Sequence, residues 1–301
     1  MIFVVASASL VAGCGNDTDS GSSRSSHDGM GMTHSTATTG AEKSGNGGAG
    51  GMAGDGSMPG MDADATGMSK SNAHFTLKLL TPKVSTSDAT IRFRILSRHG
   101  GRLRDYEPEY TKQLHLIAVR RDFTHYQHLH PTLAADGTWE IATSFTAQGP
   151  YRLIADFTPS GGDRTVLATD VMVGDQANYL PEPLLPARAT AAVDGYTVTL
   201  KPSGVRAGSE GSLAFDVRLQ GKPVKLQPYL GSIGHAVVIR TDDFAYLHVH
   251  PSDRSGSDKR LTFDLTLPSA SRYVAYVQFQ TDDQVHTAVF LLDARKGAVT
   301  E

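Results

Sequence analysis

The sequence predicts an all-β protein in which two similar antiparallel β-sandwiches follow one another along the chain. Three observations favour this fold class. After residue 74 the chain consists of short alternating runs rich in Val, Ile, Thr, Tyr and Phe, separated by Gly, Pro, Asp and Ser. No stretch keeps a helical period of 3.6 residues over three turns. The 301 residues are enough for two domains, and the second half of the chain repeats the first.

Each half is expected to contain seven short strands. In the first half they lie near residues 75–80, 89–96, 113–120, 126–130, 138–145, 151–157 and 165–173. In the second half they lie near residues 195–201, 211–219, 234–240, 245–250, 260–267, 272–280 and 285–293. Seven strands with frequent turn signals are typical of an immunoglobulin-like sandwich. Three prolines within residues 177–188 favour an extended linker, so the repeats are expected at residues 74–176 and 189–296.

An internal duplication relates the two halves. Residues 99–131 align with residues 219–251 at an offset of 120 without a gap. Both copies fit the pattern G-[RK]-x5-P-x6-H-x6-D-x3-Y-x-H-x-H-P. Histidines are therefore the strongest feature that the two repeats share.

The N-terminus predicts export. Residues 1–13 include an apolar run that is too short to span a bilayer and is typical of a signal peptide. Residues 10–14 resemble a bacterial lipobox, whose cysteine is acylated, so we expect Cys14 to anchor the chain to the outer face of the cell membrane. No Lys or Arg precedes the run, so either the true start lies upstream or the signal is atypical. Since Cys14 is the only cysteine, disulfides and thiolate sites are excluded from the repeats.

Residues 14–73 are expected to form a disordered tether. From residue 15 to residue 74 there is no Ile, Leu, Val, Phe, Tyr or Trp, yet six of the eight methionines lie there. A thioether with no core to fill suits Cu(I), although a linker that merely tolerates Met is the alternative. The formal net charge of −3 argues against nucleic-acid binding. The candidate ligands in this segment are His27, Met30, Met32, His34, Met58 and Met61.

Two His-x-His pairs predict metal binding in the repeats. Side chains alternate along a strand, so His128 and His130 share one face. A hairpin turn at residues 121–122 would place His115 directly opposite His128 and diagonal to His130. Three converging imidazoles form a ligand set for Cu(II) or Zn(II), although such histidines can also be ordinary core or surface residues. The candidate ligands are His115, His128, His130, His235, His248 and His250, with His286 as a weaker candidate for the second set.

This combination resembles bacterial extracytoplasmic copper-handling lipoproteins, which join a lipobox and a Met/His-rich tether to immunoglobulin-like domains of the CopC or YtkA/FixH-like sort. Residues 113–119 with 127–131, and 234–238 with 247–251, carry the resemblance. It implies copper binding for sequestration, tolerance or delivery, with a copper-donating or copper-receiving protein as a partner beside the membrane. The N-terminal His ligand of the CopC type is not reproduced, because an acylated N-terminus would replace it.

Three functions follow from these patterns. The leading hypothesis is a membrane-anchored copper protein, with zinc as the other candidate metal. A blue-copper centre is excluded because it needs a Cys thiolate. The second hypothesis is an adhesion or assembly module, since a fold does not give a function. The third is a tri-His zinc hydrolase, but no H-E-x-x-H or G-x-S-x-G motif is present and no catalytic residues are expected. The patterns leave open Cu(I) or Cu(II), one site or two, and storage, delivery or sensing.

Overall fold

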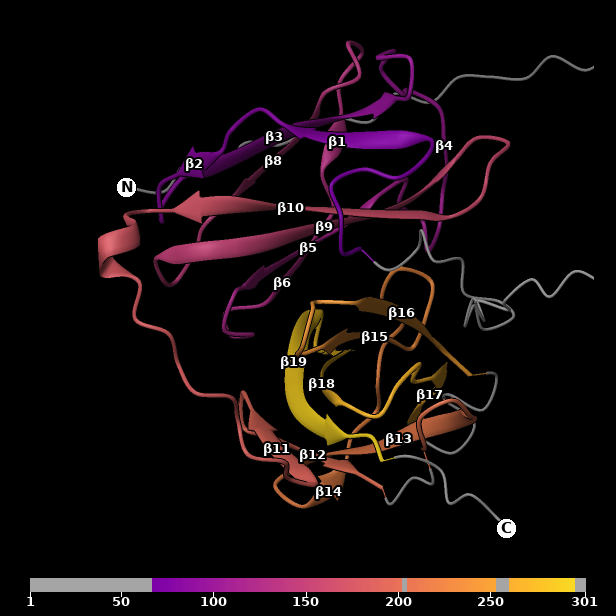
Figure 1. The fold of residues 1–301 in the computed structure, drawn as a ribbon. Coiled ribbons are helices and arrows are strands. Elements are labelled where there is room, and N and C mark those ends of the chain that lie inside the picture. Colours follow the sequence, from indigo (N-terminus) through magenta and orange to yellow (C-terminus); the bar gives the residue numbers. More distant parts are fainter. Residues whose placement is uncertain (1–66, 202–204, 253–259, 296–301) are drawn as a thin grey trace, which may run out of the picture. The chain divides into compact units, whose positions relative to one another are not determined.

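The computed structural model describes residues 67–201, 205–252 and 260–295, which belong to one compact unit (Figure 1). Within these ranges the regular structure is β-strand apart from one short 3-10 turn, η2 (Gln176–Asn178). No helix in the same ranges is long and apolar enough to cross a membrane. The predicted all-β class with two tandem sandwiches is confirmed.

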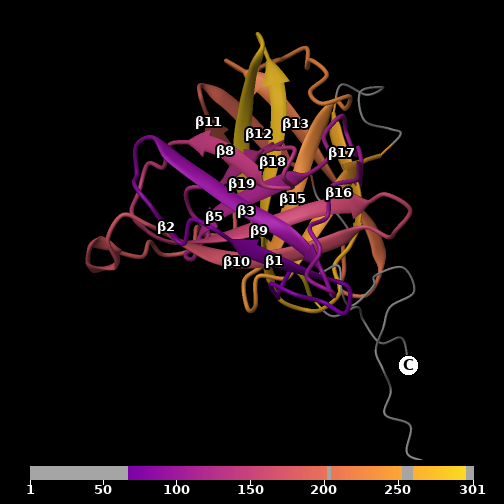
Figure 2. The ribbon, with the colours of Figure 1, turned by 90° about the horizontal axis from the view of Figure 1, so that it is seen from above.

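The first sandwich has two sheets. One sheet has the order β1 (Phe75–Leu79), β3 (Ala89–Ser97), β8 (Trp139–Thr143) and β7 (Thr132–Leu133). The other has the order β2 (Lys83–Val84), β10 (Thr165–Val173), β9 (Gly149–Pro159), β5 (His115–Arg120) and β6 (Gln127–Leu129), and β4 (Tyr106–Glu107) also pairs with β9. Figures 1 and 2 show β1 and β3 covering β9 and β10. In immunoglobulin letters these orders are A-B-E-D and A′-G-F-C-C′, so the topology is that of an immunoglobulin sandwich.

A tyrosine near the start of strand F closes each sandwich in the same way. In β9 the Tyr151 hydroxyl donates to the Ala147 carbonyl oxygen, four residues upstream, at 3.0 Å. In the second sandwich the Tyr273 hydroxyl donates to the Ser269 carbonyl oxygen at 2.9 Å. This arrangement is the tyrosine corner of immunoglobulin-like sandwiches, and here it is present in both repeats.

Tyr151→Phe is expected to lower the free energy of unfolding by about 1 kcal/mol, because a partly buried hydrogen bond is lost while the buried ring stays packed. Urea unfolding measures the change. Tyr179→Phe is the matched control, since the Tyr179 ring packs against Gly149 while its hydroxyl has no hydrogen bond to the described residues. Equal stability of Tyr151→Phe and the parent protein would contradict a structural role for the corner.

The second sandwich repeats the first with one change of pairing. Its strands are β11 (Thr190–Val193), β12 (Tyr196–Leu200), β13 (Glu210–Leu219), β14 (Lys222–Pro223), β15 (Gly234–Arg240), β16 (Tyr246–Pro251), β17 (Leu261–Thr266), β18 (Arg272–Thr281) and β19 (Gln284–Asp293). β16 pairs with β15 at one end and with β17 at the other, so it connects the two layers as one continuous strand. In the first sandwich two separate strands, β6 and β7, take these places.

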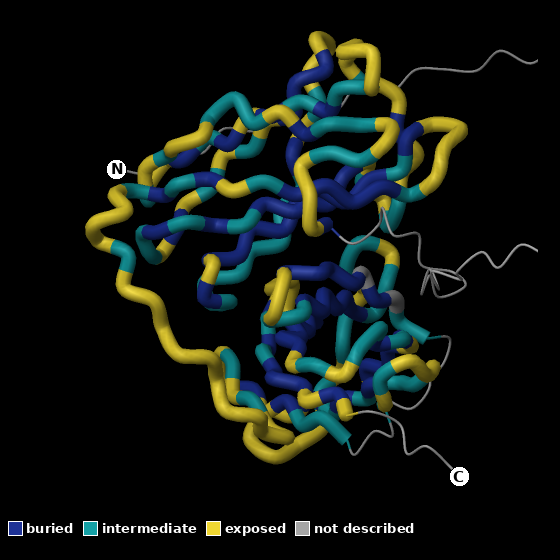
Figure 3. Tube along the Cα trace, viewed as in Figure 1, coloured by how far each residue is buried: buried dark blue, intermediate teal, exposed yellow. Residues whose placement is uncertain are grey.

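A third hydrophobic cluster joins the two sandwiches. Side chains alternate along β5, so Leu116 and Ala118 face the core of their own sandwich, while Ile117 and Val119 face the other way. There they pack in one cluster with residues of the second sandwich, including Tyr276 of β18. This explains why β5 is buried along its whole length, which Figure 3 shows in dark blue. The strand that carries His115 is therefore covered on both faces.

The described chain begins to pack before the first predicted strand. The Ala168 amide donates to the Ser69 carbonyl oxygen at 2.7 Å, and the Leu77 amide donates to the Lys70 carbonyl oxygen at 2.8 Å. Gly67 lies against Val166. Residues 67–73, which the sequence assigned to the tether, thus lie along the first sandwich.

Candidate metal centre

Three histidines of the first sandwich come together. One ring nitrogen from each of His115, His128 and His130 lies within 4.8 Å of the others. Their ring centroids are 4.8 to 5.1 Å apart. His115 is buried on β5, His128 lies on β6, and His130 follows that strand. These are the three residues that the sequence predicted as the ligands of the first repeat.

The strand register differs from the prediction by two residues. Ile117, rather than His115, pairs with His128, and His115 therefore lies diagonal to His128. The turn is longer than expected because the Asp122 carboxylate accepts hydrogen bonds from the Thr124 amide and hydroxyl, while Phe123 adopts a left-handed φ of 66°. A shift of two residues keeps every side chain on its face, so the three rings still converge.

Two neighbouring oxygens fix which ring nitrogens carry protons. His115 Nε2 lies 3.0 Å from the Glu109 carbonyl oxygen, which can only accept, so this nitrogen donates. His128 Nδ1 lies 2.8 Å from Gln278 Oε1, so it donates as well. Gln278 Nε2 points to the Thr287 hydroxyl at 3.3 Å, which agrees with this orientation of the amide.

The inner nitrogens then carry lone pairs. His115 Nδ1 and His128 Nε2 are 2.9 Å apart, and in neutral rings neither has a proton to share. His130 Nε2 is buried without a hydrogen-bond partner among the described residues. The facing lone pairs of His115 and His128 repel each other unless a cation lies between them. Either a proton or a metal ion can supply that charge.

Electrostatics disfavour the proton. Burial lowers the pKa of His128 well below its ordinary value, and the neighbouring His130 and His115 lower it further. Burial likewise lowers the pKa of His130 to about 3, with His115 and Lys112 acting in the same direction. His128 and His130 are therefore neutral at pH 7, which is the form that binds a metal ion.

A tight turn positions the Glu109 carbonyl oxygen that accepts from His115 Nε2. Glu109 and Lys112 exchange backbone hydrogen bonds of 2.8 and 2.9 Å, and the two residues between them, Tyr110 and Thr111, have φ values of 45° and 67°. Two consecutive positive φ values are typical of a type I′ turn. A β-branched residue is strained in this region, and such strain often lies beside a functional site.

The second repeat builds the same support for His235. His235 Nε2 lies 2.9 Å from the Tyr229 carbonyl oxygen, again at a turn with positive φ, at Leu230 and Gly231. The backbones of His248 and His250 lie in β16, where His248 pairs with Val237. Their side chains lie outside the described residues, so the second predicted ligand set stays a prediction.

His286 does not lie with these groups. It pairs with Phe279 across β18 and β19 and shares the face that packs in the core of the second sandwich. Its Nδ1 lies 2.8 Å from Asp194 Oδ2, and its Nε2 lies 3.0 Å from Thr281 Oγ1. Gln278, one residue along from Phe279, reaches His128 instead. The predicted lipidation site Cys14 lies outside the described residues, and so do the weaker ligand candidates His27, Met30, Met32, His34, Met58 and Met61.

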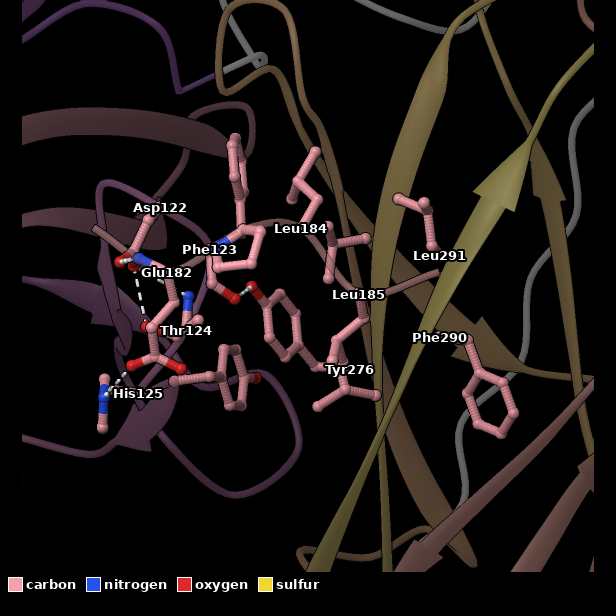
Figure 4. Close-up of a pocket in the computed structure, with 14 residues that line it drawn as sticks. Asp122, Phe123, Thr124, His125, Glu182, Leu184, Leu185, Tyr276, Phe290 and Leu291 are labelled. Carbon is pink, nitrogen blue, oxygen red and sulfur yellow. Dashed lines mark hydrogen bonds and ion pairs between the residues drawn. The ribbon is translucent and has the colours of Figure 1, made fainter. Parts of the chain in front are cut away.

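A pocket of about 320 Å³ lies beside the linker and does not include the three histidines (Figure 4). Its wall contains Phe123 and Tyr276, whose hydroxyl donates to the Phe123 carbonyl oxygen at 2.7 Å. His125 also lines the pocket, and its Nε2 lies 3.1 Å from Glu182 Oε1. The pocket is mostly apolar and brings together no set of metal ligands among the described residues.

The sequence missed two parts of the site. Gln278 was overlooked because it lies in the other repeat, 150 residues from His128. A polar residue within the apolar run 273–279 was the available signal. The Glu109 carbonyl has no sequence signal, since any residue would supply it.

The metal-free protein is expected to lose stability as the pH falls below about 6.5. The depressed pKa values of His128 and His130 mean that the unfolded chain binds protons there that the folded chain does not. The contribution of these rings to the free energy of unfolding is thus fully present above their pKa in the unfolded chain. It declines as the pH falls toward their pKa in the folded chain, by up to about 1.4 kcal/mol per pH unit for each ring. Urea unfolding at pH 7, 6 and 5 measures the slope. An unchanged slope in His128→Gln/His130→Gln would contradict the assignment.

Comparisons with known proteins give weak structural likenesses. The chain is 12% identical to an Escherichia coli adhesin, FdeC, over 77% of this chain and 66% of that one, with a TM-score of 0.24. It is 11% identical to a tetra-tandem repeat of a large adhesion protein, over 74% of this chain and 49% of that one, with a TM-score of 0.26. Fibronectin(III)-like modules of Clostridium thermocellum CbhA are 12% identical, over 75% and 97%, with a TM-score of 0.22. The chain thus spans less than two thirds of either adhesion structure, and likeness at this level says nothing of function. No curated protein matches the chain.

A family model matches both repeats. It is described as a domain of unknown function, DUF8832, and it matches residues 69–174 and again residues 191–296. The two matches together cover more than half of the chain and coincide with the two sandwiches. The chain belongs to the DUF8832 family and contains two copies of its domain.

Proposed function

We propose that the chain is an extracytoplasmic copper-binding protein whose centre is the cluster of His115, His128 and His130. The observation that supports this most is the convergence of three imidazoles, two of which have their outer nitrogens bonded to oxygens of the protein. Imidazole suits copper and zinc alike, and copper binds such a site more tightly in the usual order of divalent metals. Anchoring through Cys14 would hold the centre at the membrane surface.

The proposed role is sequestration or delivery of the ion. His130 is only half-buried, so an ion in the centre can be reached from solvent. Thioethers of Met30, Met32, Met58 and Met61 would bind Cu(I) in the preceding segment and supply it to the centre. The partner would be a second copper protein that donates or receives the ion at the membrane.

A copper titration of the full chain tests the proposal. Cu(II) is titrated in competition with a chelator, and EPR records the nitrogen hyperfine pattern. Wild type is expected to bind one more tight equivalent than His128→Gln/His130→Gln, and the double variant should lose the nitrogen hyperfine contribution of His128 and His130. His99→Gln is the control, because His99 is an exposed histidine that contacts Arg98.

Two results would overturn the proposal. Equal copper capacity in wild type and the double variant would remove the centre, and the tandem sandwiches would then fit an adhesion or assembly module better. If the protein binds Zn(II) tightly and does not bind Cu(II), the centre is a zinc site instead of a copper site. The control variant separates loss of the centre from loss of any one histidine.

A further inference from the structure

Resting on the proposed copper function, we infer that the centre is shared between the two sandwiches. Gln278 of the second sandwich holds His128 in place, and His235 of the second sandwich supplies the fourth nitrogen. Copper would therefore bind across the junction of the two repeats and lock them together.

Gln278 is placed as a positioning residue. Its Oε1 accepts from His128 Nδ1 at 2.8 Å, and this bond fixes the proton on the outer nitrogen and turns Nε2 toward His115. An acceptor on the outer nitrogen of a ligating histidine orients the ring and raises its basicity, and losing such a partner typically lowers metal affinity 10- to 100-fold. Here the acceptor comes from β18, in the other repeat.

His235 lies at the same junction. β15 pairs with β18 so that His235 is directly opposite Gln278, which puts both on one face of the sheet. The ring of His235 is 6.0 Å from that of His128 between centroids, against 4.8 to 5.1 Å within the three-histidine cluster. His235 Nε2 donates a hydrogen bond to the Tyr229 carbonyl oxygen, so the lone pair of the neutral His235 ring is on Nδ1, as in His115. We therefore place His235 as the fourth imidazole of the centre.

Aromatic side chains cover the centre on the side of the second sandwich. Tyr110 of the first sandwich meets the His235 ring edge-on at 5.1 Å, and Tyr126 stacks on Tyr276 of the second at 4.1 Å. A fourth imidazole would fill the position that three nitrogen donors leave to water.

Variants of the full chain test the inference by Cu(II) competition titration and EPR. Gln278→Ala is expected to weaken Cu(II) binding 10- to 100-fold, and Gln278→Glu to restore it, because a carboxylate also accepts from His128 Nδ1. His235→Gln should weaken binding and change the nitrogen hyperfine pattern from four donors to three. Gln280→Ala, two residues along β18, is the matched control and should bind as wild type.

Hydrogen exchange gives a second readout that needs no variant. Binding of Cu(II) to wild type is expected to slow amide exchange in β15 and β18 as well as in β5 and β6. Protection confined to β5 and β6, with wild-type affinity and EPR in Gln278→Ala and His235→Gln, would overturn the shared centre and leave the three-histidine centre intact. If wild type binds no Cu(II), both the proposed function and this inference fail.

Discussion

Saturation with Cu(II) is expected to raise the free energy of unfolding by about 4 kcal/mol when free Cu(II) is 1,000-fold above its Kd. An ion that binds the folded chain and not the unfolded one stabilises by mass action. In the metal-free cluster the lone pairs of His115 and His128 face each other, and the relief of their repulsion by the ion is part of its affinity.

Thermal unfolding measures this stabilisation. For a cooperative unit of this size, about 4 kcal/mol corresponds to a rise in Tm of roughly 8–16 °C. His128→Gln/His130→Gln should show no rise, while His99→Gln should show the full rise. A chelator should return wild type to its metal-free Tm. An equal rise in the double variant would assign the bound copper to other residues.

The fold could be predicted because its signals are local. Each predicted strand has a counterpart in the structure, since alternation over five or more residues is visible in the sequence. Four of the five additional strands, β2, β4, β7 and β14, have only two residues and cannot show a period. The pairing of β16 with both β15 and β17 could not be predicted either, because it depends on how the two sheets pack.

The histidine cluster could be predicted in part, because residues two apart in a strand lie on the same face. His128 and His130 share a face in any strand, and an error of two residues in the register left His115 on that same face. An error of one residue would have separated them. His286 shows the converse, because its pairing with Phe279 directs it into the core of the second sandwich.

The contribution of the second repeat could not be predicted. Gln278 reaches His128 only because the two histidine-bearing sheets pack against each other, and nothing local in the sequence encodes that packing. The duplication gives a hint in hindsight. Asp156 and Gln278 occupy equivalent positions, opposite His115 and His235 respectively, and each reaches into the other sandwich. Polar residues at equivalent places in two apolar strands thus mark the junction.

Asp156→Asn is expected to lower the free energy of unfolding by about 3 kcal/mol, because it removes the nearer carboxylate of the partly buried Arg164 and leaves only that of Glu109, 3.8 Å away. The Asp156 carboxylate is fully buried and accepts from Arg164 Nε at 2.9 Å and, across the junction, from the Tyr246 hydroxyl at 2.9 Å. Burial disfavours the charge of Arg164, yet Asp156 raises the pKa of the guanidinium above its ordinary value. The loss should fall at the low end of the range for broken buried pairs, since the Arg164 side chain is 32% exposed and water can reach it.

Three further variants locate the source of that loss, all by urea unfolding. Asp170→Asn on β10 is the matched control, because that carboxylate is 47% exposed and its ion pairs should contribute less than about 1 kcal/mol. Tyr246→Phe removes only the bond across the junction and should cost about 1 kcal/mol. Asp156→Asn/Arg164→Met should be more stable than Asp156→Asn alone, because the cation that has lost its nearer carboxylate is gone. If the double variant is no more stable, the loss comes from the bond to Tyr246, and the carboxylate acts chiefly to hold the two sandwiches together.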